Sequence, residues 1–207
     1  MKKAMSKMSI RGKILSSFIT VTVLLLIVSG LIGSAMTTID TTYSDLLKND
    51  GAAQGYLGEA LASFCLVDEY LHDAVSFEDP QRAAEAAGEI DVYKADFEKY
   101  MALAEPLMIE ANPIGVDENG EVIYVNEIEL FNQTMDYYKK YCAAIDGIVA
   151  KIGKVESAEI QAQFVDVIDP VYDPLYDGVF ELTEYKQQAA VYGSERASYR
   201  SEVTRLF

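Results

Sequence analysis

Residues Ile14–Met36 form a run of 23 residues that contains no charged side chain and is mostly apolar. A helix needs about 20 such residues to cross the hydrocarbon core of a bilayer. We therefore predict one transmembrane helix over 14–36. A cleaved signal peptide is the alternative, with Gly33-Ser34-Ala35 as a small-residue cleavage site. The length of the run, and a helical pattern that continues past Met36 without a turn signal, favour the uncleaved span.

Charge is distributed unevenly on the two sides of this run. Residues 1–13 carry five cationic side chains and no acidic one, whereas all 33 Asp and Glu lie beyond Met36. By the positive-inside rule, 1–13 is a cytoplasmic stub and 37–207 is an extracytoplasmic domain, so we expect a protein of the cell membrane. The formal net charge of −16 argues against nucleic acid as a partner, because nucleic-acid-binding proteins present a basic face to the phosphates.

The chain lacks the motifs that carry enzyme chemistry. It has no nucleophile elbow, no phosphate-binding loop and no pair of His residues at metal-ligand spacing. The one His, His72, lies a turn from Asp68, which we interpret as a solvated helix face rather than a metal site. We predict no enzymatic activity, no metal and no cofactor. For Cys65 and Cys142 we favour free thiols packed as small apolar groups, with a disulfide between them as the alternative.

Beyond Met36 the apolar residues recur at alternating steps of three and four, which is typical of helices packed at shallow angles. We predict an all-α fold, an up-down-up-down antiparallel four-helix bundle over 37–207 preceded by the transmembrane helix. Asp79-Pro80 provides a start signal, a capping acid followed by Pro at the first helical position. The expected helices cover 37–77, 80–108, 124–152 and 155–207.

Three of these helices have a well-defined stripe of apolar residues along one face, which we expect to face the core. In the first helix the stripe begins Ile39, Tyr43, Leu46, Ala53 and Leu57. In the third it contains Ile128, Phe131, Met135, Tyr138, Cys142, Ile145, Val149 and Ile152. In the fourth it contains Ala162, Val165, Ile168, Tyr172, Leu175, Val179, Leu182, Lys186 and Ala189. No segment of 37–207 has a secure strand pattern; Asn119-Gly120 suits a hairpin turn, but its flanks are short.

The start of the chain resembles the amino terminus of bacterial methyl-accepting chemotaxis receptors. The resemblance is carried by a short basic stub with Ile10-Arg11-Gly12-Lys13, followed by the apolar run and the helical region. In that family the outer region is a four-helix-bundle ligand-binding domain, and a second membrane helix, a HAMP linker and a coiled-coil signalling domain follow. Contact with a chemotaxis kinase complex would run only through those later parts. Some sensor histidine kinases and nucleotide cyclases share the same sensor layout.

The resemblance implies a membrane-anchored extracytoplasmic sensor for signal transduction in chemotaxis. The alternative is a helical bundle without a sensing role, anchored or secreted, that acts as a scaffold or adhesin.

Small residues recur on one face of the first helix, at Gly51, Gly55, Gly58 and Ala62. Each Gly costs a helix about 1 kcal/mol relative to Ala, so we interpret this small-residue stripe as a site of close approach by another backbone. The neighbour is either the fourth helix of the same chain or the first helix of a second subunit. We predict a homodimer.

A second feature is the proline patch of the last helix, in which Pro170 and Pro174 alternate with Tyr and Asp. We predict that both prolines interrupt the helix and create an irregular polar and aromatic surface. Its acids favour a cationic small-molecule ligand held against a ring face. The candidate ligand residues are Asp169, Tyr172, Asp173 and Tyr176, with Glu59 at the same depth on the first helix. Arg82, near the distal tip, is the rival anchor and would favour an anion.

Overall fold

A computed structural model of the protein describes residues 10–205. The described chain divides into two compact units, one made of 10–44 with 194–205 and the other of Asp45–Gly193. The predicted cytoplasmic stub falls mainly on residues 1–9, which lie outside the described part of the chain.

The first unit contains most of helix α2 (Ile10–Asp45). An 18-residue window of this helix has a mean hydropathy of 2.4, and none of the window is buried. Thr20 and Thr22 donate their hydroxyl hydrogens to the carbonyl oxygens of Ser16 and Phe18, at 2.8 and 2.9 Å. Both hydroxyls are therefore satisfied without water. Within residues 10–205 this is the one helix long and apolar enough to cross a membrane, judged by length and composition.

The last turns of α7 (Asp169–Arg205) belong to the same unit. Hydrogen bonds to Ser198 and Ser194 lower the pKa of the Tyr43 hydroxyl, which lies near the end of α2. Ala197 is buried. The end of α2 and the last turns of α7 are thus in contact within this unit.

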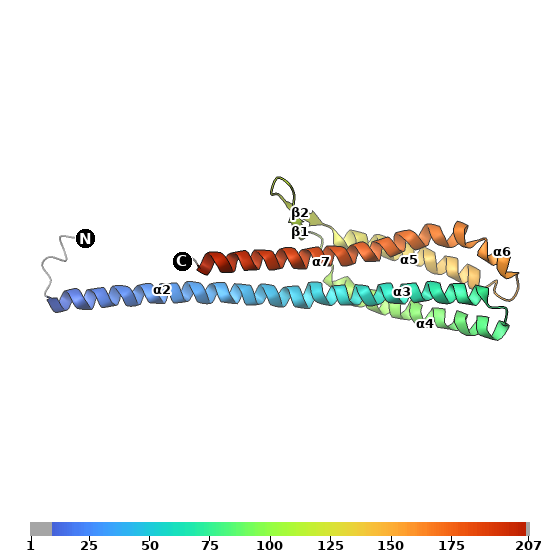
Figure 1. The fold of residues 1–207 in the computed structure, drawn as a ribbon, viewed down its shortest axis with the longest axis horizontal. Coiled ribbons are helices and arrows are strands. Elements are labelled where there is room, and N and C mark those ends of the chain that lie inside the picture. Colours follow the sequence, from blue (N-terminus) through green and yellow to red (C-terminus); the bar gives the residue numbers. More distant parts are fainter. Residues whose placement is uncertain (1–9, 206–207) are drawn as a thin grey trace. The chain divides into compact units, whose positions relative to one another are not determined.

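The second unit, Asp45–Gly193, is predominantly helical, with one small sheet (Figure 1). This confirms the predicted all-α class. Its helical elements are the π-helix η1 (Leu46–Gly51), α3 (Ala52–Ser76), α4 (Pro80–Ala104), the 3₁₀ turn η2 (Glu105–Leu107), α5 (Glu127–Val149), α6 (Ser157–Gln161), the π-helix η3 (Phe164–Ile168) and α7 up to Gly193. Its strands are β1 (Asn112–Val116) and β2 (Val122–Val125).

Two helix starts follow directly from capping residues. The Asp79 carboxylate accepts a hydrogen bond of 2.9 Å from the Gln81 N–H, and Pro80 takes the first helical position of α4, as predicted. Asn126 caps α5 in the same manner by accepting from the Glu129 N–H at 3.1 Å.

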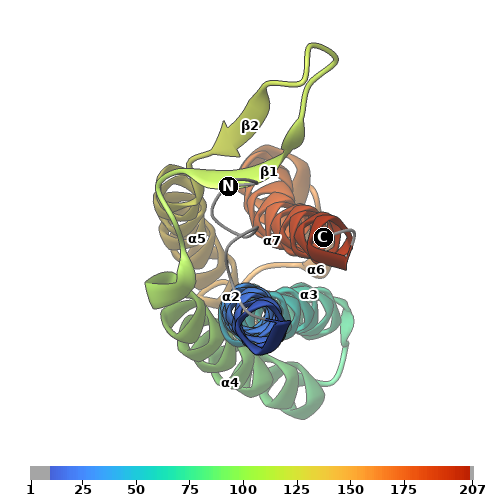
Figure 2. The same cartoon turned by 90° about the vertical axis from the view of Figure 1, so that its left-hand side faces the viewer.

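Helices α3, α4, α5 and α7 lie side by side around one apolar interior (Figure 2). The interior is lined at heptad positions of α3 such as Leu57, Phe64 and Leu71, all fully buried. Helices α5 and α7 come especially close at Gly178, where an added Cβ would clash with the Thr134 side chain. Only a residue without a side chain fits there.

The predicted stripe of α5 is partly wrong. Its buried residues step at four and three from Glu127, and Ile128 is 43% exposed. Phe131, Tyr138 and Ile145 are buried as predicted, whereas the other buried residues lie one position earlier than predicted and include polar side chains. The buried set is Glu127, Phe131, Thr134, Tyr138, Tyr141, Ile145 and Ile148.

The absence of strands was also a wrong expectation. Strands β1 and β2 pair antiparallel as a hairpin that projects from the helices (Figures 1 and 2). The Asp117 carboxylate closes its turn by accepting from the N–H groups of Asn119 and Glu121, at 2.9 and 2.8 Å. Gly120 adopts the positive φ of 82° that the turn requires. The connection between the strands thus extends over 117–121 and is longer than the two-residue turn Asn119-Gly120.

The last helix is interrupted earlier than predicted. Helix α6 and the π-helix η3 precede α7, which begins at Asp169, so Pro170 lies in a first turn where its missing N–H is tolerated. Pro174 lies inside α7, which continues through it. The prediction that both prolines interrupt the helix is therefore wrong, since Pro170 lies in the first turn of α7 and Pro174 lies inside a helix that continues.

Candidate functional site

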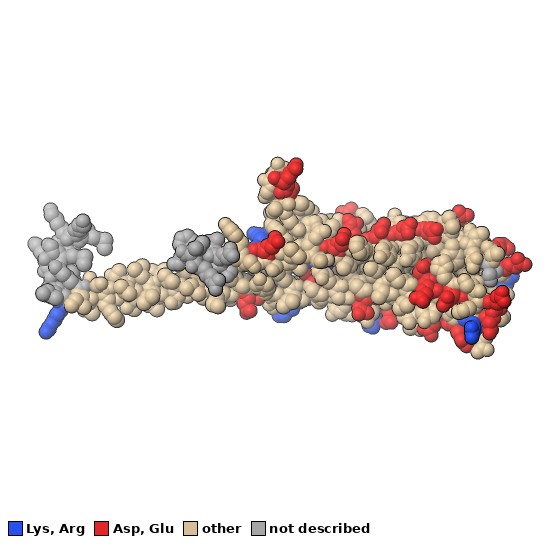
Figure 3. Space-filling model, viewed as in Figure 1, with Lys and Arg blue, Asp and Glu red and all other residues tan. Residues whose placement is uncertain are grey.

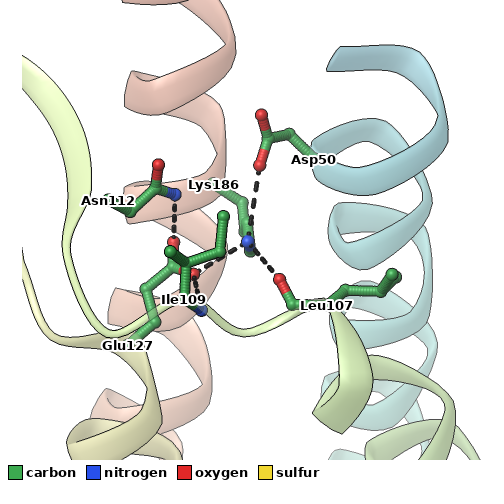
Figure 4. A network of polar contacts seen from close by, with 6 residues as sticks. All are labelled: Asp50, Leu107, Ile109, Asn112, Glu127 and Lys186. Carbon is green, nitrogen blue, oxygen red and sulfur yellow. Dashed lines mark hydrogen bonds and ion pairs between the residues drawn. The ribbon is translucent and has the colours of Figure 1, made fainter. Parts of the chain in front are cut away.

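The most unusual side chain in the second unit is Lys186 of α7, whose exposed fraction is 0%. Its Nζ lies 2.8 Å from the Glu127 Oε2, 2.6 Å from the Leu107 carbonyl oxygen and 3.4 Å from the Asp50 Oδ1 (Figure 4). Three acceptors match the three protons of an ammonium group. We call Lys186 with Glu127, Asp50 and their direct partners the lysine node.

Glu127 is as deeply buried as Lys186 and is held from several sides. Its carboxylate accepts from the Ile109 N–H at 3.0 Å and from the Asn112 side-chain amide at 2.6 Å. Its own N–H donates to the Ile109 carbonyl at 3.0 Å. Glu127 therefore fixes the connection after α4 and the first residue of the hairpin to the start of α5.

Asp50 is the less firmly held carboxylate of the node. Burial raises its pKa, while the charge of Lys186 and the hydrogen bond to it act in the opposite direction. Lys186 and Glu127 already neutralise each other, so the charge of Asp50 is the uncompensated one. Burying such a charge is costly, and the node holds it only through Lys186.

The sequence contains a signal for this node that periodicity alone passes over. Lys186 occupies an apolar position of the fourth stripe, and Asp50 fills the gap between Leu46 and Ala53 in the first. Glu127 directly precedes Ile128 at the start of the third. A charged residue at a core position of a helix requires a partner, and here the partners come from different helices.

A second cluster, of aromatic rings that include tyrosines, lies nearer the middle of the helices. Phe64 packs against Tyr141 and Tyr172, with centroids 5.0 and 4.8 Å apart. The Tyr141 hydroxyl donates to the Asp68 carboxylate at 3.4 Å, and burial raises the pKa of both groups. Burial likewise raises the pKa of Tyr172 to about 12. The cluster, which we call the aromatic column, contains Phe64, Phe97, Tyr138, Tyr141, Tyr172, Tyr176 and Phe180.

The structure brings together only part of the predicted ligand patch. Tyr172 and Tyr176 stack with centroids 6.2 Å apart and are half-buried, whereas Asp169 and Asp173 are exposed on α7. Tyr172 of α7 lies opposite Phe64 of α3, which its ring contacts, and close enough to Asp68 of α3 to be affected by its charge. Phe64 and Asp68 are both nearer to the tip than the exposed Glu59. Asp68, which the sequence analysis did not select as a ligand residue, takes the place expected for Glu59.

His72 lies beside this cluster. Its Nε2 is 3.8 Å from the Asp68 Oδ2, and its ring lies over Phe164 with centroids 4.6 Å apart. The described residues contain no group of three or more His, Cys, Asp or Glu arranged to hold a metal ion. The geometry suits an ion pair with Asp68 when the imidazole is protonated.

Arg82 lies apart from the proline patch, in a hollow of about 390 Å³ between α3 and α4. Three carboxylates, those of Asp73, Glu85 and Glu89, line this hollow with it. The predicted preference of Arg82 for an anion is therefore opposed by its surroundings.

A second hollow, of about 470 Å³, lies at the tip where α3, α4 and the connection after α5 meet. Small side chains leave this space: Ala83, Ala84 and Ala87 line it from α4, and Ala74 from α3. Its charged lining residue is Glu78. The volume is within the range of small-molecule sites, and no residue of the proline patch lines it.

The small-residue stripe lies on the outer face of α3. Gly51, Gly55, Gly58 and Ala62 are exposed, and a Cβ added at Gly55 or Gly58 would meet nothing within 4 Å. The fourth helix of the same chain is thus not its neighbour. Cys65 continues the stripe by one more step and is an exposed free thiol, and Cys142 is free as well.

Comparison with known proteins gives no family and no relative: no protein-family model matches the chain, and no curated protein matches its sequence.

We expect Lys186→Met to destabilise the protein by about 3–5 kcal/mol, because the change leaves two carboxylates buried without their cation. The measurement is denaturant unfolding of the full chain in detergent micelles, followed by circular dichroism. Lys139→Met is the matched control, since Lys139 pairs with Asp136 on the exposed surface of α5. It should change the free energy of unfolding by no more than about 0.5 kcal/mol. Equal effects of the two changes would show that the node contributes no more than a surface ion pair.

Proposed function

We propose that the protein is a membrane-anchored extracytoplasmic ligand sensor of a chemotaxis-type signal-transduction receptor. The observation that carries the proposal is that one continuous helix, Ile14–Ser76, contains both the fully exposed apolar window and the first core helix of the second unit. An apolar surface of that length has no partner in water, and a bilayer would cover it.

In this proposal 14–36 spans the cell membrane, with 1–13 in the cytoplasm and 37–207 outside. The outer part is an up-down-up-down antiparallel four-helix bundle built from α3, α4, α5 and α7. Support comes from the single apolar interior that these helices share and from their succession along the chain. Acidic side chains far outnumber basic ones on the surface of the second unit (Figure 3), which suits a domain kept away from an anionic cytoplasmic leaflet.

Labelling in intact cells tests this topology. In a chain with Cys65→Ser and Cys142→Ser, we expect Ser6→Cys to resist an impermeant thiol reagent, because the stub is cytoplasmic. Val92→Cys, at an exposed position of α4, should react under the same conditions. Reaction of Ser6→Cys before lysis, or protection of Val92→Cys, would contradict the proposal.

The ligand in this proposal is a small cation bound beside the aromatic column. Burial raises the pKa of Asp68, and the nearby charge of Asp169 raises it further, so both carboxylates bear on this region; Tyr172 offers a ring face. An ammonium group gains about 0.5–2 kcal/mol from a ring face and more from a carboxylate. The two hollows near the tip are the rival sites.

A thermal-shift screen of the full chain against amines, amino acids and organic acids identifies the ligand, because binding raises the melting temperature by mass action. For a ligand so found, Tyr172→Ala combined with Asp173→Asn should weaken binding by roughly tenfold or more. Arg82→Ala and the hollow-filling Ala87→Leu should leave binding unchanged. Loss of binding with either of these, and not with the double variant, would move the site to the tip.

We also propose that two copies associate through the small-residue stripe. The residues of the stripe carry no charge, and Glu59 is the one charged residue between Gly51 and Cys65, whereas much of the remaining surface of the unit is acidic and would repel a second copy. Helices can approach closely along small residues because their backbones meet without intervening side chains.

Oxidation of the native thiols tests this association. We expect Cys65 to form a disulfide-linked dimer in membranes, and Cys65→Ser to abolish it, because paired stripes bring the two Cys65 residues together. Desolvation by neighbouring side chains and the nearby Asp68 carboxylate raise the pKa of the Cys65 thiol, so the oxidation is carried out at alkaline pH. Cys142→Ser is the control and should not affect the yield. A dimer linked through the half-buried Cys142, or none at all, would contradict the proposed interface.

A scaffold or adhesin is the alternative function. The observation that favours it is the projecting hairpin, whose Ile123 and Tyr124 are 41% and 60% exposed. This alternative would be favoured if the thermal-shift screen identified no ligand and if removal of the hairpin abolished attachment to surfaces.

A further inference from the structure

The segment η1 (Leu46–Gly51) is a π-helix within an otherwise α-helical course from α2 to α3. A π turn holds one more residue than an α turn, so it behaves as a one-residue insertion. Such segments are rare, are less favourable than α-helix in isolation, and often occur at functional positions. Something in the surrounding structure must therefore hold η1 in this form.

Two contacts with α7 hold it. The Asp50 carboxylate reaches Lys186, and Leu46 packs on Gly193 so closely that an added Cβ would lie 2.7 Å from the Leu46 Cδ2. Lys186 and Gly193 are seven residues apart on α7, so they lie on the same face of that helix. Both ends of the π segment are thus attached to one face of one partner.

The two carboxylates of the lysine node differ in how firmly they are fixed. Glu127 contacts Lys186 at 2.8 Å and accepts two further hydrogen bonds from Ile109 and Asn112. Asp50 contacts Lys186 at 3.4 Å, and no second donor to its side chain occurs among the described residues. When Asp50 departs, Lys186 loses one acceptor but keeps the Glu127 carboxylate and the Leu107 carbonyl oxygen, whereas departure of Glu127 would leave several buried groups unpaired. Asp50 is the exchangeable ligand of Lys186.

We propose that η1 is a register switch with a π form and an α form, and that the contact of Asp50 with Lys186 selects the π form. Loss of the contact lets the segment relax to α-helix. The residues before Leu46 then turn relative to α3 by up to about 100°, the angle of one residue. The use of this turn as a signal rests on the proposed sensor function, but the switch itself does not.

Deletion of Lys48 tests whether η1 contains an inserted residue. Lys48 is exposed, and its removal would leave a plain α-helix with the same register on both sides. We expect the full chain in nanodiscs to keep its helicity and its cooperative unfolding. Deletion of Glu59, which is equally exposed but lies within α3, is the matched control and should unfold the chain by shifting Phe64 and Leu71 out of the core. Unfolding by both deletions would overturn the proposal.

Thiol reactivity then tests the switch. In a chain with Cys65→Ser, we introduce a thiol two residues before η1 with Ser44→Cys; Ser44 is half-buried, and the substitution is nearly isosteric. Asp50→Asn should change the rate of its maleimide reaction by at least about threefold, while the native Cys142, mapped by mass spectrometry, keeps its rate.

The same Asp50→Asn change should have no effect on Ser44→Cys in the chain lacking Lys48, because no π turn is left to relax. An unchanged rate in the full-length chain would overturn the proposal. An equal change in both chains would also overturn it, because Asp50 would then act only as a structural contact.

Discussion

A fully buried ammonium group needs a counter-charge and three hydrogen-bond acceptors at the place where it lies, and Lys186 obtains these from three separate parts of the chain. One acceptor comes from the π segment before α3, one from the end of the 3₁₀ turn after α4, and one from the first residue of α5. The long connection between α4 and α5 therefore has a fixed origin, and the hairpin begins at a residue, Asn112, that is itself bonded to Glu127. A two-stranded hairpin is marginally stable by itself, and attachment to the node accounts for its presence here.

The two ends of the helical unit are stabilised in different ways. At the tip, α4 begins at a capped Asp79-Pro80 start, and the helices enclose a hollow lined by alanines. At the opposite end, buried charges replace apolar packing. Apolar contacts tolerate small displacements, whereas a buried ion pair with satisfied geometry does not, because each lost contact leaves a charged group unsolvated. A change of register at the node end is therefore expected to occur between discrete states rather than gradually.

The sequence predicted the helices well wherever local signals and periodicity agree. The start of α4, the end of α3 near Phe77 and the predominance of helix all follow from capping residues and from steps of three and four. Periodicity does not predict the lysine node, because it makes Lys186 one more member of a stripe and leaves Asp50 in a gap of another. A charge at a heptad position indicates a partner but not its location, since the partner is set by tertiary packing. The same holds for Asp68, which reaches the aromatic column only because α3, α5 and α7 meet there, and for Gly178, whose need for a glycine depends on Thr134 of another helix.

Helix α7 connects the two polar clusters of the second unit. Tyr172 of the aromatic column and Lys186 of the node are separated by 14 residues, two heptads, so they lie on the same face about 21 Å apart. Leu175, Val179 and Leu182 between them are fully buried, and Gly178 fits closely against Thr134. A continuous helix packed in this way is not compressible over such a distance, so a displacement at Tyr172 reaches Lys186 as a movement of the whole helix. The firm contact of Lys186 with Glu127 resists that movement, and the weaker contact with Asp50 yields to it first. Because the contact of Lys186 with Asp50 would break first, the helix that responds would be the one that contains Asp50. That helix continues from the apolar segment.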